Sequence, residues 1–159
     1  MPHVHDTVRA GVDDMTADVQ QILAAAADEI GGATSCSVIL RLEQGLRRVA
    51  SSDDRAAACD DAEVAERGGP CVLAMDQLSG VIVPDVSLET RWPGWVAAAE
   101  VGGFRSGAAL PAYVREGAVL ALNLYSERLD PWDAEALVRA DGYAQEVARV
   151  LREHTVGYG

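Results

Sequence analysis

The chain has 159 residues, of which 49% are hydrophobic and 24% are charged, a balance typical of one globular domain with its own core. Its net charge is −12 and its 13 basic residues are all arginines, which disfavours binding to nucleic-acid backbones or anionic membranes and excludes chemistry that needs a lysine. No apolar run approaches the roughly 20 residues of a membrane span, and no secretory signal begins the sequence, so we expect a cytoplasmic protein.

The first expected elements are a long helix and a hairpin. Residues 6–30 carry apolar side chains at helical spacing, with Asp6 as the expected N-cap and glycines at 31–32 to end the helix. Residues 36–42 and 46–52 are expected strands around a short turn that contains glycine, which favours an antiparallel hairpin.

The segment after the hairpin is rich in alanine and acidic residues. Residues 54–66 contain no glycine or proline and predict a helix. Because its apolar side chains are mostly alanine, we expect this helix to pack weakly or to be mobile. Five acidic side chains around it are interpreted as a solvated face: Asp53, Asp54, Asp60, Asp61 and Glu63.

Short elements follow in the middle of the chain. Two glycines and Pro70 end the acidic helix and begin a short one over residues 70–76, which places Cys71 near a helix N-terminus. Residues 80–84 predict a short buried strand, and residues 93–101 predict a further helix after a loop.

The last elements are a second hairpin and a second long helix. Residues 104–112 and 117–126 predict strands, and the second is so continuously apolar that we expect it to be central. Asp130 is the expected cap of the last helix, with Pro131 at its first position and an apolar stripe over residues 132–153. Because strands and helices do not alternate strictly, the order predicts an α+β fold of about five strands, largely antiparallel, with helices on both faces.

Three short segments carry a family resemblance. They are Gly-Gly-Pro-Cys at 68–71, Thr-Arg-Trp-Pro at 90–93 and Asn-Leu-Tyr-Ser at 123–126. Their order and spacing resemble the GAF domains of actinobacteria, especially those found with ANTAR RNA-binding output domains. The resemblance covers residues 15–153, nearly the whole chain.

This resemblance implies a mainly antiparallel sheet of about five or six strands, with the two terminal helices on one face and short helices over a pocket on the other. It also implies sensing and regulation, with the output in a partner or in a removed part of the gene product. The sequence lacks the Asn-Lys motif of cyclic-nucleotide binders, the core histidine of haem binders and the aromatic and histidine residues around a bilin cysteine. We therefore predict no bound cofactor.

The predicted pocket draws on several elements. Its expected ligand-binding residues are Cys71, Met75, Trp92, Trp95, Arg105, Ser106, Asn123 and Tyr125. Trp92 alternatively anchors its helix to the sheet. Arg105 alternatively forms a salt bridge to Asp85 or Glu100. The two members on the last strand share one of its faces, where pocket lining and internal hydrogen bonds fit the pattern equally well.

The three cysteines leave two interpretations open. Cys71 is either a redox-responsive residue whose thiolate the helix N-terminus stabilises, or a small buried residue. If Cys59 met Cys71 in space, the two could form a switchable disulfide. The odd number of cysteines and the absence of CxxC spacing argue against a zinc site, and we predict no metal.

The leading functional hypothesis is a non-catalytic sensory domain that binds a small molecule and forms a homodimer through helices 6–30 and 132–153. One alternative is a thiol-based reductase similar to the free methionine sulfoxide reductases, with Cys71 and either Cys59 or Cys36 as its reactive pair. Another is a ligand-free dimerisation module. A hydrolytic triad is not credible, because no histidine lies in the middle of the chain.

Overall fold

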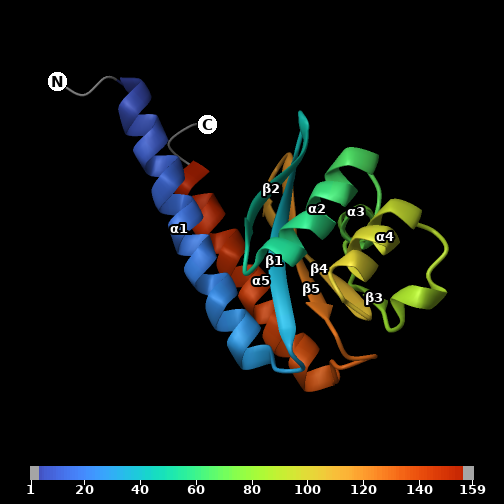
Figure 1. The fold of residues 1–159 in the computed structure, drawn as a ribbon. Coiled ribbons are helices and arrows are strands. Elements are labelled where there is room, and N and C mark those ends of the chain that lie inside the picture. The colour runs from blue at the N-terminus through green and yellow to red at the C-terminus, as the bar shows by residue number, and fades with distance from the viewer. Residues whose placement is uncertain (1–3, 156–159) are drawn as a thin grey trace.

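The computed structural model of this protein describes the backbone of residues 4–155 and the side chains of residues 14–154. Helices and strands follow one another in an order that begins and ends with a long helix (Figure 1). In chain order the elements are α1 (Val4–Ile30), β1 (Thr34–Leu42), β2 (Gly45–Ser51), α2 (Asp54–Glu66), α3 (Pro70–Gln77), β3 (Val81–Val83), the 3-10 helix η1 (Val86–Leu88), α4 (Pro93–Val101), β4 (Ser106–Arg115), β5 (Ala118–Ser126) and α5 (Ala134–Thr155).

The five strands form one sheet in the order β2-β1-β5-β4-β3, and all of its strand pairs are antiparallel. The α+β prediction is therefore confirmed. β5 is the central strand of the sheet, as its continuous apolar character predicts. Both of its faces are covered, so its side chains are buried on either side. Its register places Asn123 between Ser37 of β1 and Ala109 of β4, in the middle of the sheet.

The sheet separates two layers of helices, as the resemblance implies (Figure 1). α1 and α5 pack against each other and against one face, and α2, α3 and α4 cover the other. The core on the α1 and α5 side is apolar and fully buried. It includes Val19, Leu23, Val38, Leu120, Leu122, Val147 and Leu151. In α5, the small side chains of Ala140, Ala144 and Ala148 recur every four residues on the buried face, which lets this helix approach the sheet closely.

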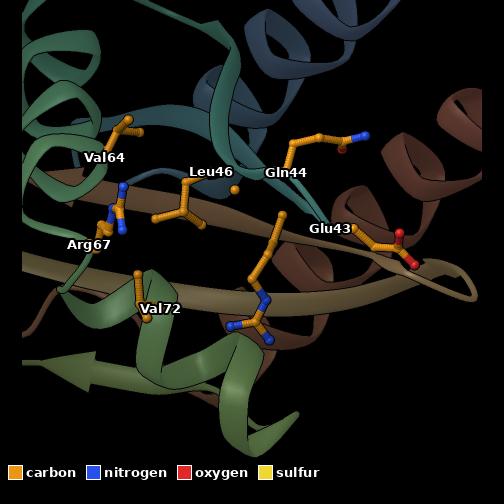
Figure 2. Close-up of a pocket in the computed structure, with 8 residues that line it drawn as sticks. Glu43, Gln44, Leu46, Val64, Arg67 and Val72 are labelled. Carbon is orange, nitrogen blue, oxygen red and sulfur yellow. The ribbon is translucent and has the colours of Figure 1, made fainter.

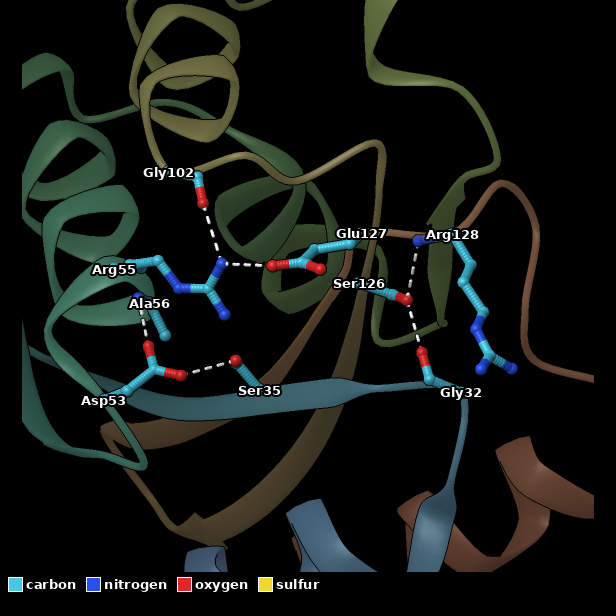
Figure 3. Close-up of polar contacts among 9 residues, drawn as sticks. All are labelled: Gly32, Ser35, Asp53, Arg55, Ala56, Gly102, Ser126, Glu127 and Arg128. Carbon is cyan, nitrogen blue, oxygen red and sulfur yellow. Dashed lines mark hydrogen bonds and ion pairs between the residues drawn. The ribbon is translucent and has the colours of Figure 1, made fainter.

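The start of α2 is tied to β1 by a polar contact (Figure 3). Asp53 caps the helix, because its carboxylate accepts the backbone N–H of Ala56 at 2.9 Å. The hydroxyl of Ser35 on β1 donates to the other oxygen of the same carboxylate at 2.5 Å. The Asp53 side chain therefore caps α2 and holds the start of this helix against β1.

A second tie joins α2 to the end of α4 (Figure 3). The Arg55 guanidinium donates to the carbonyl of Gly102 at 2.9 Å and to the carboxylate of Glu127 at 2.6 Å, and it lies 4.7 Å from the centre of the Phe104 ring. With these ties and a buried face, α2 is an integral part of the structure. The expectation that it packs weakly is wrong, because polar contacts hold this helix against the sheet and α4 where its alanine side chains offer little apolar surface.

Two helix starts also differ from the sequence-based expectation. α5 begins at Ala134, and Asp133 is its cap, since its carboxylate accepts the N–H of Ala136 at 2.8 Å. Asp130 lies in the preceding turn, where its own N–H binds the carbonyl of Pro84 at 3.1 Å. α1 begins at Val4, so residue 6 lies inside this helix and is not its cap. Among residues 4–155, no helix combines the length and the apolar character needed to cross a bilayer.

Candidate functional site

Aromatic rings fill the space between α4 and the sheet. Trp95 of α4 is 1% exposed, and its indole N–H donates to the hydroxyl of Tyr125 at 3.3 Å. Tyr125 in turn stacks on Phe104, with ring centres 5.1 Å apart. β4 has Gly107 where the indole crosses it, and a Cβ there would lie 2.9 Å from the Trp95 ring. These aromatic side chains therefore fill the space between α4 and the sheet.

A cluster of buried polar groups lies beside these rings. Asp60 on α2 is 0% exposed, and one of its carboxylate oxygens, Oδ1, is the acceptor on which the cluster converges. It accepts the hydroxyl of Ser37 at 2.7 Å, the amide of Asn123 at 3.1 Å and the hydroxyl of Tyr125 at 3.1 Å. Two predicted site residues, Asn123 and Tyr125, are thus brought together by internal hydrogen bonds to a residue interpreted as solvated.

Glu63 lies one turn further along the same face of α2 and is 1% exposed. Its carboxylate accepts the backbone N–H of Cys71 at 3.0 Å. Gly69 has φ +145°, and a Cβ on it would overlap the Glu63 carboxylate. The Gly-Gly-Pro-Cys segment therefore wraps closely around a buried acid, and only glycine meets both requirements at position 69.

Both acids bind protons more tightly than ordinary carboxylates do. Burial raises the pKa of Asp60 to about 7, although the hydrogen bonds donated to it act in the opposite direction. Burial raises the pKa of Glu63 to about 8, and the neighbouring charge of Asp60 adds to the rise. The charged forms of both groups lack a cation at contact distance among the described residues.

The other predicted site residues lie apart. Met75 is buried between α3 and the sheet with Cys71, and Ser106 is a strand-end residue whose hydroxyl donates to the carbonyl of Arg128 at 2.6 Å. Trp92 is half-buried and meets Trp95 edge-to-face, with ring centres 6.2 Å apart.

Arg105 is exposed, next to a small hollow of about 190 Å³ that Asp85 and Glu100 also line. Among the described residues, it forms a salt bridge with neither of these acids. The predicted residues thus do not surround one common cavity.

An open groove of about 480 Å³ lies elsewhere, between the turn of the β1–β2 hairpin, the end of α2 and the start of α3 (Figure 2). Leu46, Val64 and Val72 form an apolar wall, and Arg41 and Arg67 supply positive charge. None of the eight residues predicted from the sequence lines this groove.

The matched family model is that of the GAF domain, over residues 14–152. The chain belongs to the GAF domain family. This covers most of the chain and includes the α2 cluster, the groove and the greater part of both terminal helices. A search among curated proteins found no significant match.

Solved structures share the fold. The GAF domain region of a protein from Geobacter sulfurreducens PCA has a TM-score of 0.72 at 17% identity, over 92% of this chain and 98% of that chain. A type II free methionine-R-sulfoxide reductase from Thermoplasma acidophilum gives 0.68 at 13% identity, over 91% and 96%. The GAF domain from an Acinetobacter phosphoenolpyruvate-protein phosphotransferase gives 0.66 at 15% identity, over 100% and 98%.

The thiols of this GAF domain are buried, and none forms a disulfide. Burial raises the pKa of Cys59 to about 12 and that of Cys71 well above its usual value, and in both cases nearby carboxylates add to the rise. Burial, together with the neighbouring Glu63, thus outweighs the helix N-terminus at Cys71. Cys36, whose pKa burial raises to about 12, lies on the opposite face of the sheet, in the core with α1 and α5.

The residues that the sequence analysis missed in this GAF domain are Asp60 and Glu63, together with the groove. A signal for the two acids exists: Ala56, Cys59, Asp60 and Glu63 share one helical face, and the first two are small apolar residues of the kind that point to a core. The interpretation of the five acidic residues as one solvated face is wrong, because Asp54 and Asp61 are exposed whereas Asp60 and Glu63 are buried.

Proposed function

We propose that this GAF domain is a regulatory module that binds a small molecule in the groove between the β1–β2 hairpin, α2 and α3. The observation that carries the proposal is the contrast between the two candidate spaces. The space under α4 is occupied by Trp95, Tyr125 and Phe104, whereas the groove is open and combines an apolar wall with charged groups. GAF domains are typically sensory or regulatory, which agrees with a site that recognises a ligand without transforming it.

The groove is connected to the rest of the fold through α2. Val64 and Arg67 line it, and Glu63, directly before Val64, lies in the buried cluster. A ligand that shifts the end of α2 therefore acts on a helix that is bonded to β1 and to the end of α4. This is the proposed route from binding to a change in the regulatory state of the domain.

The test is a thermal-shift screen of small metabolites, together with native mass spectrometry of freshly purified protein. Val72→Trp fills the groove from α3, and Val138→Trp is its control, because Val138 is 72% exposed on α5. We expect a ligand that raises the melting temperature of the wild type and of Val138→Trp and has no effect on Val72→Trp. A ligand that stabilises all three proteins equally would show that the groove is not the site.

Self-association through α1 and α5 is part of the proposal. The two helices leave a shallow hollow of about 440 Å³ between them on the outside of the domain, lined in part by Ile22, Tyr143 and Val150. A second copy of the chain would cover the half-exposed side chains of Ile22 and Tyr143. An output module of the ANTAR type and an actinobacterial source are further parts of the proposal that rest on the sequence resemblance. Light scattering that shows a monomer at high concentration would contradict the dimer.

The second candidate function is a thiol-based reductase, which the fold shared with the Thermoplasma acidophilum enzyme favours. The thiols oppose it, because the reactive species is the thiolate, and burial together with the carboxylates beside Cys59 and Cys71 disfavours that form. An assay of methionine sulfoxide turnover with wild type and Cys71→Ser decides between the two. Turnover by the wild type that the variant lacks would establish the enzyme.

A further inference from the structure

We propose that the groove selects a small organic anion, in which a carboxylate or a phosphate is attached to a short apolar chain. This rests on the proposed function, because it names the ligand class for the same groove. Two features carry it: the positive charge of Arg67, which no described residue neutralises, and an apolar wall next to that charge.

The Arg67 side chain is the main anion anchor. It lies beside Leu46 and Val72 in the groove (Figure 2). Among the described residues it has no hydrogen bond and no ion pair. A guanidinium presents five N–H donors in a planar fork that matches a carboxylate or a phosphate. In a chain with 25 acidic and 13 basic residues, an arginine without a partner at the rim of a groove is available for an external anion.

Arg41 adds a second positive charge from β1. Its Nη1 donates to Asp76 of α3, which fixes the guanidinium against the groove and uses only part of its donors. Glu43 is the one acidic residue among the described residues that line the groove, and its carboxylate points away from Arg67 in Figure 2. The charge facing a ligand is therefore positive at the Arg67 end.

The apolar wall next to these charges explains why the anion needs an apolar part. Leu46, Val64 and Val72 pack with their inner atoms against the small core under α3 and are half-buried. Their outer atoms line the groove, so an apolar chain on the ligand would remove them from water. The volume of about 480 Å³ lies within the usual range for small-molecule sites.

The backbone at Arg67 provides a way to test the anchor without harming the fold. Arg67 ends α2 in the left-handed region, with φ 54° and ψ 38°, where glycine is the usual residue. Arg67→Gly therefore removes the guanidinium and relieves the backbone at the same time. Leu78 ends α3 in the same conformation, φ 53° and ψ 40°, and does not line the groove. Leu78→Gly is thus the matched control.

The first experiment compares probes that differ only in their charged group. Hexanoate, hexyl phosphate, hexanol and hexylammonium are titrated into labelled protein, and the amide resonances of Leu46, Val64 and Val72 are followed by NMR. We expect hexanoate or hexyl phosphate to bind at least tenfold more tightly than hexanol, with no binding of hexylammonium; the preferred member of the first pair identifies the acid group. Equal or tighter binding of hexanol or hexylammonium in the groove would overturn the anion inference and leave the proposed function standing.

The second experiment uses the variants with the tighter of the two anionic probes. We expect Arg67→Gly to weaken binding at least tenfold without lowering the melting temperature, Leu78→Gly to bind like the wild type, and Asp76→Asn to bind more tightly because it frees Arg41. Wild-type affinity in Arg67→Gly would overturn the inference. If no probe perturbs the groove, the inference also fails, and the Val72→Trp comparison separately decides whether the groove binds any ligand.

Discussion

Asn123 donates its amide to Oδ1 of Asp60 at 3.1 Å, and the remaining oxygens of the two side chains, Oδ2 of Asp60 and Oδ1 of Asn123, are buried without a partner. These two buried oxygen atoms are both acceptors, and neither has a hydrogen-bond donor. A proton on Oδ2 of Asp60 turns that oxygen into a donor. The raised pKa of Asp60, about 7, agrees with a carboxyl group that is protonated in much of the folded population at neutral pH.

We expect the domain to become less stable as pH rises from about 4 to about 8. The unfolded chain releases the two protons near the ordinary pKa values of 3.8 and 4.5, whereas the folded chain holds them until about 7 for Asp60 and about 8 for Glu63. Between these limits the unfolded state is stabilised by ionisation, so the free energy of unfolding falls with rising pH by roughly 5–10 kcal/mol. Urea unfolding at a series of pH values measures it.

Asp60→Asn isolates the contribution of one acid to this pH dependence. We expect the variant to be more stable than the wild type at pH 8 and to have a smaller pH slope, because asparagine is neutral and supplies the missing donor. Asp61→Asn, at an exposed neighbouring position, serves as the control and keeps the wild-type slope. Identical slopes in all three proteins would mean that Asp60 titrates normally in the folded state.

Gly69→Ala tests the wrapping of the glycine segment around Glu63. The new methyl group overlaps the buried carboxylate, and the backbone conformation at φ +145° is one that other residues rarely adopt. We expect a loss of about 3 kcal/mol or more in the free energy of unfolding. Gly31→Ala controls for the backbone alone, since Gly31 has φ +78° with no atom within 4 Å of the added Cβ, and about 1 kcal/mol is expected there. Similar losses in both variants would contradict the close packing.

Trp95→Ala tests whether this ring fills the space beneath α4. We expect a loss of about 3–5 kcal/mol from the cavity that replaces the indole. Free indole should then restore part of the melting temperature of the variant and leave that of the wild type unchanged, because an apolar cavity accepts a matching ring. Absence of rescue together with a small loss of stability would indicate that the roof rearranges over the gap.

Thiol labelling tests the state of the cysteines. We expect none of Cys36, Cys59 and Cys71 to react with a disulfide reagent in the native protein at pH 7.5, and all three to react in urea, since burial keeps them protonated and inaccessible. Ser87→Cys introduces an exposed thiol and should react at once. Rapid labelling of Cys71 in the native wild type would argue for the reductase.

Much of the fold follows from local patterns. The helix over residues 54–66, the helix over residues 93–101 and the central position of β5 were all predictable, because apolar periodicity, proline and glycine act over a few residues. Element starts were less predictable: two aspartates, at 130 and 133, each suit the cap of α5. Asp133 is the one that accepts the N–H of Ala136, whereas the backbone N–H of Asp130 binds the carbonyl of distant Pro84.

The site depended on contacts between segments far apart in the chain. The resemblance to GAF domains implied a roofed sheet, but the aromatic residues at 92, 95 and 125 serve equally well to line a chamber or to fill it. The absence of a side chain at Gly107, on a different strand, lets Trp95 lie against the sheet and closes the space. Likewise, the sequence of an acidic helix predicts a solvated face. The folded structure instead places Ser37, Asn123 and Tyr125 in hydrogen-bond contact with Asp60. Whether a polar group faces water or other polar groups depends on which strands lie opposite it, and that arrangement is set by the packing of the whole sheet.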